Sequence, residues 1–173
     1  MSIANWSTMD TLIGPFTAVV AEDGAVLASG WTGEVAELTS LIAPAIAPAE
    51  LKERQDLGEV SAAIRRYHAG EFDAVDGIAV RQQSGAFRER AWEVLRTVKP
   101  GAPVTYADYA TLAGSPTAVR AAASACARNA AALFVPCHRV VRTGGALGGF
   151  RWGVDAKRLA THPRGLHKLS RPD

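Results

Sequence analysis

One segment in the C-terminal half constrains the fold more than any other part of the sequence, because it predicts two helices joined by a tight turn. Thr105 precedes the first helix, and Asp108 three residues later gives the spacing of a capping box. Gly114 suits the left-handed turn beyond a helix end. We expect Ser115 to cap the second helix, with Pro116 at its first position. This is the outline of a helix-turn-helix, although any helical hairpin shares it. The buried face of the first helix is expected to contain Tyr109, Ala110, Leu112 and Ala113.

The second predicted helix consists almost entirely of small residues between Ala118 and Ala127, and Arg120 and Arg128 are its only long charged side chains. Small side chains let a helix approach a neighbouring helix closely, which favours an internal packing role. The same property suits a helix that must come close to a nucleic-acid groove, with Arg120 projecting from it. The residues by themselves leave both interpretations open.

The composition is that of an ordinary globular chain. It has 173 residues, of which 48% are hydrophobic and 21% charged, enough for one domain or two small ones. The net charge of +2 divides into −6 for residues 1–98 and +8 from Lys99 onward. A basic half can attract phosphate, although it can equally be a solvated surface. We find no secretory signal and no apolar run long enough to span a membrane, and two cysteines are too few for a disulfide scaffold or a four-cysteine zinc site. The sequence therefore predicts a soluble protein of the reducing cytoplasm.

The N-terminal half predicts a small β unit followed by a helix. Phe16, Ala18 and Val20 alternate with other residues as in a half-buried strand, and Gly24 indicates a turn before a second extended run. The other expected elements are a loop or broken helix over residues 41–51, a helix over 59–69, a strand over 72–80 and a helix over 87–98. None of these elements indicates a chemistry.

Cys137 and His138 follow a strongly apolar stretch, which places them at the edge of a core. A cysteine reacts as its thiolate, and His138 and Arg139 are neighbours that could stabilise that form. A lone cysteine is more often an inert buried residue. From the residue types alone both interpretations stand.

The run Pro136-Cys137-His138-Arg139-Val140 resembles the active-site signature of the methylated-DNA–protein-cysteine methyltransferases, also called 6-O-alkylguanine-DNA alkyltransferases. The stretch from Phe87 to Lys157 resembles the C-terminal domain of that family throughout. The matching features are Trp92, Thr105-Tyr106, the small-residue helix with Arg120, Asn129 eight residues before the cysteine, and the run from Gly148 to Gly153. Residues 1–80 resemble the N-terminal domain of the family more loosely, through Ile13-Gly14-Pro15 and Tyr67…Gly70.

The resemblance implies an α+β protein of two parts. Residues 1–82 would form a small α/β domain of the ribonuclease H-like kind, and residues 83–168 a helical domain of the winged helix-turn-helix kind that carries the DNA-binding surface and the active site. Residues 169–173 would be a tail. The implied partner is double-stranded DNA that contains an alkylated guanine, bound by a monomer with no membrane attachment.

By the same resemblance, the small-residue helix enters the minor groove while the damaged nucleotide is flipped out of the duplex. Arg120 would fill the gap left in the base stack, and Tyr106 would crowd the phosphate and donate to N3 of the guanine. Asn129 would hold the turn between the recognition helix and the active site. The implied DNA-binding residues are Thr105, Tyr106, Arg120, Ala121 and Ser124. The implied pocket residues are Val140, Gly148, Phe150, Arg151, Trp152 and Lys157.

The implied catalytic residues are Cys137, His138 and Tyr106. Cys137 would attack the alkyl carbon and keep the alkyl group as a thioether, so each molecule would act once as a methylated-DNA–[protein]-cysteine S-methyltransferase. Tyr106 would act as a general acid while guanine leaves. The resemblance implies neither a cofactor nor a metal ion.

Two positions depart from the family pattern. The glutamate that orients the family's active-site histidine is replaced by Arg164, which predicts a Cys137 thiol of higher pKa and a slower transfer. Ala130 stands where a proline commonly follows the asparagine, and we expect this to loosen the turn slightly. Trp152 fits the bulky form seen in many bacterial relatives and would narrow the pocket against large alkyl groups.

The function expected from these features is repair of 6-O-alkylguanine, mainly methylguanine, with 4-O-alkylthymine as a further substrate. One alternative is a damage sensor that binds the lesion with weak or no transfer, which the loss of the glutamate at Arg164 favours. A second is a cysteine hydrolase, although adjacent residues such as Cys137 and His138 rarely place a base correctly on its nucleophile.

Overall fold

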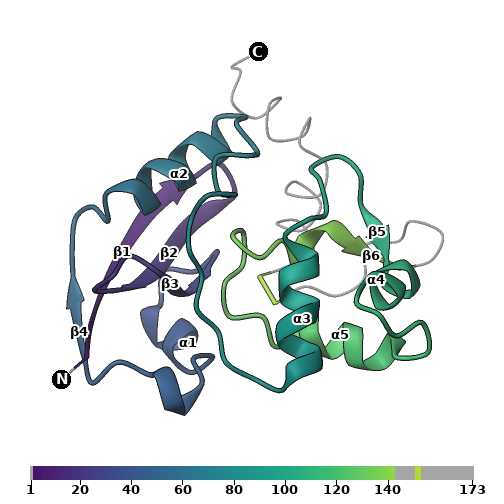
Figure 1. Cartoon of the computed structure of the whole chain (residues 1–173). Coiled ribbons are helices and arrows are strands. Elements are labelled where there is room, and N and C mark those ends of the chain that lie inside the picture. Colours follow the sequence, from purple (N-terminus) through teal and green to yellow (C-terminus); the bar gives the residue numbers. More distant parts are fainter. Residues whose placement is uncertain (1, 143–150, 153–173) are drawn as a thin grey trace.

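The computed structural model describes residues 2–142 and 151–152, and it is a mixed α+β structure (Figure 1). The N-terminal half contains a four-stranded sheet of order β3-β2-β1-β4. Its strands are β1 (Ile3–Thr11), β2 (Gly14–Ala21), β3 (Val26–Gly30) and β4 (Glu50–Glu53). The first three strands are antiparallel neighbours, whereas β4 pairs parallel to β1. In this order β3 is an edge strand. The candidate site depends on this position of β3 at the edge of the sheet.

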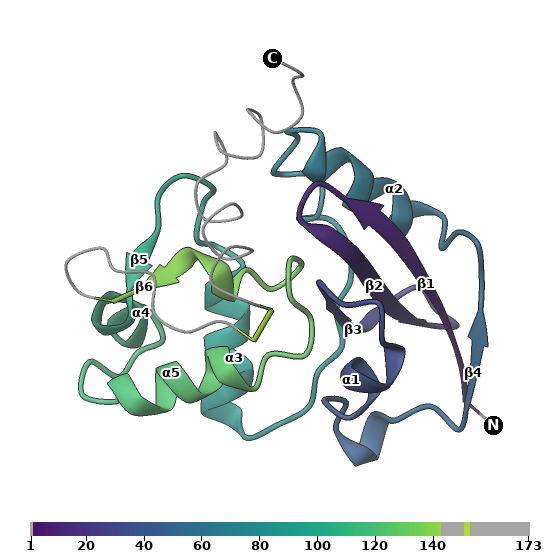
Figure 2. The same cartoon turned by 180° about the vertical axis from the view of Figure 1, so that it is seen from behind.

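Two helices cover opposite faces of this sheet. On one face, Phe16, Ala18 and Val20 of β2 belong to the same buried cluster as α2 (Glu59–His68). On the other face, Val19 lies in a cluster with Leu38 of α1 (Val35–Thr39). The side chains of β2 are therefore buried on both faces of the sheet, because successive side chains of a strand point to opposite faces. Figure 2 shows α2 and α1 on either side of the strands.

The C-terminal half is mainly helical. Its elements are α3 (Ala86–Leu95), β5 (Val104–Thr105), α4 (Tyr106–Leu112), α5 (Val119–Ala127), the 3-10 turn η2 (Cys137–Arg139) and β6 (Val140–Val141). The three α-helices pack on one another, and β5 and β6 form a short parallel pair. Trp92 of α3 donates its indole N–H to the carbonyl of Ala125 in α5 at 2.8 Å. Tyr109 of α4 donates to the carbonyl of Ala91 in α3 at 2.6 Å.

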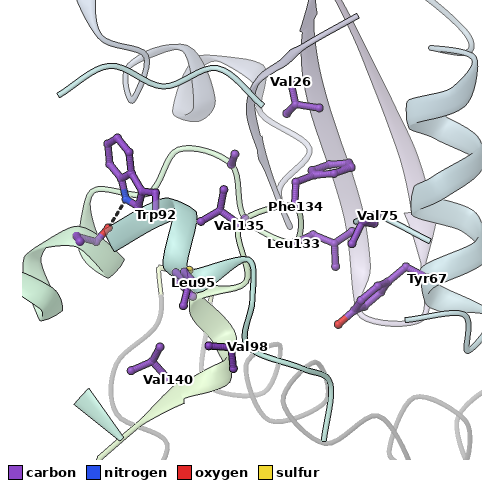
Figure 3. Close-up of a cluster of buried hydrophobic side chains, with 14 of the residues drawn as sticks. Val26, Tyr67, Val75, Trp92, Leu95, Val98, Leu133, Phe134, Val135 and Val140 are labelled. Carbon is purple, nitrogen blue, oxygen red and sulfur yellow. Dashed lines mark hydrogen bonds between the residues drawn. The ribbon is translucent and has the colours of Figure 1, made fainter. Parts of the chain in front are cut away.

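One buried cluster joins the two halves. It extends from Val26 in the sheet and Tyr67 of α2 to Leu133, Phe134 and Val135, and on to α3 (Figure 3). The apolar stretch before Cys137 therefore lies between the sheet and the helices and packs against both. A 3-10 turn, η1 (Pro44–Ile46), and β4 occupy the segment expected to be a loop or broken helix.

Three predictions of local structure are wrong. The second helix of the hairpin begins at Val119 and not after Ser115, because Ser115 begins a separate turn that the amide of Ala118 closes, and Ala118 itself is not helical. Leu112 is 53% exposed, since α4 is short and its buried face carries only the positions around Tyr109. Residues 72–80 form successive turns and not a strand, and only Val80 makes a bridge, to Val26.

Other predictions are confirmed. The hydroxyl of Thr105 accepts a hydrogen bond from the amide of Asp108 at 3.1 Å, which is the expected N-cap of α4. Gly114 has a φ of 91°, as a turn after a helix end requires. The helices expected over 59–69 and 87–98 are present as α2 and α3. No helix within the described part of the chain is long and apolar enough to cross a membrane.

Candidate active site

Cys137 lines a cavity of about 370 Å³, a volume in the range of small-molecule pockets. The thiol-bearing residue is 7% exposed, so its sulfur is largely but not completely shielded from solvent. The cavity is lined by Tyr106, Ala123, Cys126, Ala127, Asn129, Cys137, Arg151 and Trp152. These residues come from α4, from one end of α5, from the segment after α5 and from the C-terminal segment. The sequence separates them by up to 46 positions, and the helical hairpin brings them together.

Asn129 holds the chain on both sides of the turn before Cys137. Its side-chain Nδ2 donates to the carbonyl of Val135 at 2.8 Å and to Sγ of Cys137 at 3.3 Å. Its Oδ1 accepts from the amide of Ala131 at 3.0 Å. The side chain is buried, so these bonds are shielded from competing water. A donor that points at the sulfur favours the thiolate over the thiol.

Tyr106 is the first residue of α4 and reaches the cavity from the helix N-terminus. Burial, together with smaller contributions from the nearby thiols of Cys126 and Cys137, raises the pKa of its phenol to about 12. At neutral pH the phenol therefore keeps its proton and can act as a hydrogen-bond donor. This is the state that a general acid in this cavity requires.

His138 lies on the other side of the turn from the cavity. Its ring is fully buried, and its Nε2 lies 3.2 Å from the hydroxyl of Tyr67 in α2. The indole of Trp31 packs edge-on against it, with ring centroids 6.3 Å apart. The next residue, Arg139, is also buried and donates to the carbonyl of Val98 at 2.7 Å. His138 is therefore connected to the N-terminal half of the chain, and His138 does not line the cavity.

The residues expected to contact DNA lie on the hairpin beside the cavity. Arg120 and Ala121 are exposed at the start of α5, and Arg120 shares a helix face with Ala123 and Ala127, which line the cavity. Ser124 accepts a hydrogen bond from Arg88 of α3 at 3.2 Å. Thr105 uses its hydroxyl as the N-cap of α4. Of this group, Arg120 and Ala121 are exposed, and Tyr106 lines the cavity.

The expected pocket residues are only partly brought together. Arg151 and Trp152 line the cavity, and Arg151 donates to the carbonyl of Ala127 at 2.8 Å at the end of α5. Val140 is buried in β6 beside Val104 and its side chain does not line the cavity. Gly148, Phe150, Lys157 and Arg164 lie outside the described residues.

Cys126 is a further cavity residue, which was not among the site residues expected from the sequence. It is half-buried and lines the cavity beside Tyr106 and Cys137. Its position on the same face of α5 as Ala123 and Ala127 is a signal that the sequence contained, because residues three or four apart share a helix face. Within the described residues, no group of three or more histidine, cysteine or acidic side chains is arranged to hold a metal ion.

Comparison with known proteins gives three findings. Residues 86–162 match the family model described as the 6-O-methylguanine DNA methyltransferase DNA-binding domain. The chain is 31% identical over 157 residues to a methylated-DNA–protein-cysteine methyltransferase of Mycobacterium bovis, with 89% of this chain and 88% of that protein covered. It is 42% identical over 111 residues to the bifunctional transcriptional activator and DNA repair enzyme Ada of Escherichia coli, a match that covers 64% of this chain and only 30% of Ada.

Solved structures show the same fold. The crystal structure of Mycobacterium tuberculosis OGT in complex with DNA superposes with a TM-score of 0.75 and 24% sequence identity, and the match covers 95% of this chain and 94% of that one. The O6-methylguanine-DNA methyltransferase of Pyrococcus kodakaraensis superposes with a TM-score of 0.73 at 21% identity, with 96% of this chain and 99% of that one covered. Both likenesses extend over the sheet and the helices.

Proposed function

The chain belongs to the methylated-DNA–protein-cysteine methyltransferase family, and we propose that it repairs 6-O-alkylguanine in double-stranded DNA by moving the alkyl group to Cys137. The observation that carries this proposal is that Cys137 lines a cavity together with Tyr106, while the side-chain amide of Asn129 donates to the Cys137 sulfur. A purine that enters this cavity would present its alkyl carbon to the sulfur.

The proposed reaction is a direct displacement. The sulfur of Cys137 forms a bond to the alkyl carbon, the bond from that carbon to O6 of guanine breaks, and the electron pair stays on the purine. The proton that the thiol gives up ends on the purine ring, and Tyr106 donates a hydrogen bond to that ring as charge develops on it. The product on the protein is a thioether, which is a poor leaving group, so each molecule acts once.

The proposed DNA contact uses the helical hairpin. In this proposal α4 and α5 are the helix-turn-helix, β5 and β6 belong to its wing, and the N-terminal sheet with α2 is the ribonuclease H-like half. The target nucleotide is flipped into the cavity, and Arg120 takes its place in the stack. Most contacts are made to the DNA backbone, so binding weakens as salt concentration rises. The protein would act in the compartment that holds the DNA.

For this function we propose two parts of the chain. Residues 83–168 perform the alkyl transfer, and residues 1–82 support the part that performs it. Several contacts across this division support the idea that the N-terminal half positions the active-site turn. Among them are the hydrogen bond between Tyr67 and His138 and the packing of Phe134 against the sheet. Among the residues that the structure describes, all those that line the cavity come after the division.

Mass spectrometry after incubation with an oligonucleotide duplex that contains one 6-O-methylguanine tests the proposal. We expect the protein to gain the mass of one methyl group, and no more when the substrate is in excess. Cleavage after arginine separates the two cysteines, because Cys126 falls in residues 121–128 and Cys137 in residues 129–139. The added methyl is expected in the second peptide, and the variant Cys137→Ala is expected to gain none.

The same experiment distinguishes the alternative functions. Tight binding of the methylated duplex without any gain in mass would identify a damage sensor, as the replacement of the family's glutamate by Arg164 suggests. A methyl group on the peptide that contains Cys126 would also contradict the proposal. Catalytic hydrolysis of an ester or peptide would favour a cysteine hydrolase.

A further inference from the structure

Gln82 makes two hydrogen bonds to consecutive residues of the segment that precedes the active-site turn. Its side-chain Nε2 donates to Oδ1 of Asn129 at 2.9 Å, and its Oε1 accepts from the backbone amide of Ala130 at 2.9 Å. Both polar atoms of one side-chain amide are therefore used. Because the donor and the acceptor of Gln82 face partners of opposite kind, the orientation of the amide is fixed.

These bonds reach the reactive sulfur through one further side chain. Oδ1 of Asn129 accepts from Gln82 and from the amide of Ala131, and this leaves Nδ2 to donate to Val135 and to Sγ of Cys137. A rotation of the Asn129 amide by half a turn would place its oxygen against the sulfur and its NH₂ against the NH₂ of Gln82. Gln82 therefore favours the one orientation in which Asn129 donates to Cys137.

The residue at position 130 makes the second bond of Gln82 possible. Ala130 has a backbone N–H, which a proline at this position would lack. The loosening that we expected from an alanine at this position is thus opposed by a hydrogen bond that only a residue other than proline can form. The carbonyl of Ala130 is also bound, since it accepts from the amide of Ser29 at 2.8 Å.

We infer that Gln82 is a positioning residue for the alkyl transfer, which acts by holding Asn129 so that its amide donates to the sulfur of Cys137. The inference rests on the proposed function, in which that sulfur is the nucleophile. Gln82 does not line the cavity and touches no reacting atom. Its effect is on the thiolate, because a correctly aimed donor stabilises the negative charge on sulfur.

Other groups near Cys137 also act on its charge and must be held constant in a test. Tyr106, Cys126 and Arg151 line the same cavity, and His138 is the next residue in the chain. Arg142, the residue after β6, lowers the pKa of the Tyr106 phenol through its charge. None of these side chains is changed by a substitution at position 82.

The experiment compares Gln82→Met, Gln82→Glu and the control Gln83→Met. Methionine keeps the length of glutamine and removes both hydrogen bonds. Glutamate keeps the acceptor for Ala130 but places a second acceptor against Oδ1 of Asn129, so it removes the bond that orients Asn129. Gln83 is the exposed neighbour on the same segment, and its replacement controls for the change from amide to thioether.

Two quantities are measured on the full chain. The first is the pKa of the Cys137 thiol, from the pH dependence of its reaction with iodoacetamide, followed in the peptide of residues 129–139. The second is the single-turnover rate of methyl transfer from a 6-O-methylguanine duplex. We expect Gln82→Met to raise the pKa of the Cys137 thiol by about half a unit to one unit and to slow transfer by about fivefold, the effect of losing one hydrogen bond. Gln82→Glu should do the same or more, and Gln83→Met should leave both values as in the wild type.

The inference is overturned if Gln82→Met and Gln82→Glu, folded by circular dichroism, keep the wild-type pKa of the Cys137 thiol and the wild-type transfer rate. It is also overturned if Gln83→Met shifts that pKa by as much as Gln82→Met does. A wild-type protein that gains no methyl group overturns the proposed function instead. The reaction with iodoacetamide uses no DNA, so it tests the action of Gln82 on the sulfur independently of that outcome.

Discussion

At the scale of single residues, the site is made of short polar contacts whose partners lie far apart in the sequence. The sulfur of Cys137 accepts a hydrogen bond from the side chain of Asn129. His138 lies against Tyr67, which is 71 positions earlier in the chain. Burial raises the pKa of the Tyr67 phenol, so its hydroxyl stays protonated at neutral pH. The position of His138 is thus set from the N-terminal helix α2. Nothing in the spacing of His138 and Tyr67 along the sequence indicates this contact.

The variant Tyr67→Phe tests whether this contact matters for the reaction. If His138 has the catalytic role that the family resemblance implies, loss of the hydroxyl should slow methyl transfer severalfold, because the ring loses a partner that holds it. The Tyr67 hydroxyl also has a hydrogen bond with Arg139, so the free energy of unfolding should fall by at least about 0.5–1.5 kcal/mol, the usual net value of one hydrogen bond. Single-turnover kinetics and urea unfolding measure the two effects.

The matched control is Tyr109→Phe. Tyr109 is equally buried, and its hydroxyl donates to the carbonyl of Ala91 and not to His138. This variant should lose a similar amount of stability while transferring methyl at the wild-type rate. Equal slowing in both variants would show that the loss of activity follows stability alone.

At the scale of elements, the edge strand β3 places the active-site segment. Ser29 bridges to Ala131 in parallel, its amide donates to the carbonyl of Ala130, and its hydroxyl donates to the carbonyl of Ala132 at 2.8 Å. An edge strand has unpaired backbone groups, and here the chain before Cys137 pairs with them. The sheet therefore anchors residues 130–132, and the helical hairpin supplies the wall of the cavity.

Gly30 at the end of β3 lies against Trp152, which lines the cavity. A Cβ at Gly30 would overlap the indole ring. We expect Gly30→Ala to displace this ring, to cost about 1–3 kcal/mol through overpacking and to slow methyl transfer. Urea unfolding and single-turnover kinetics measure the two effects.

Gly33→Ala is the control for this substitution. A Cβ at Gly33 would meet only Pro15, at the ordinary contact distance of 3.8 Å. The control should keep both the stability and the transfer rate of the wild type. Wild-type stability and kinetics in Gly30→Ala would contradict the close packing of Trp152 on β3.

At the scale of the whole molecule, the core between the two halves contains a histidine that must stay neutral. The indole N–H of Trp31 donates to Nε2 of His68 at 3.2 Å, so Nδ1 carries the proton and donates to the carbonyl of Ile64 at 2.8 Å. Burial lowers the pKa of His68 below its usual value of 6.5. A second proton could enter only by breaking the bond from Trp31.

Stability should therefore fall in mild acid. The unfolded chain binds a proton on His68 at a higher pH than the folded chain does. The contribution of His68 to the free energy of unfolding is therefore fully present above pH 6.5 and is lost as the pH falls below that value. Urea unfolding between pH 7.5 and pH 5 measures the decrease. His68→Gln keeps an acceptor for Trp31 and a donor for Ile64 without titrating, and it should show a shallower decrease. An equally steep decrease in the variant would assign the effect to other groups.

Much of the fold could be predicted from local patterns, because these patterns act over a few residues. The cap at Thr105, the turn at Gly114 and the helices α2 and α3 are where the sequence places them. The failures occurred where local signals compete. Ser115 and Pro116 favour a helix start, but they form a turn in the structure, and the apolar residues 72–80 pack against the core without pairing as a strand.

By itself, the sequence determined the family, its type of chemistry and the proposed nucleophile Cys137, because the run from Pro136 to Val140 is contiguous and distinctive. Only the tertiary structure decided which distant side chains lie around that cysteine. Gln82 and Tyr67 reach the active-site turn because β3 and α2 pack beside it, and Cys126 joins the cavity because of its helix face. Hydrogen bonds and burial depend on distances in space, and those distances are set by the packing of the whole chain and not by any short stretch of it.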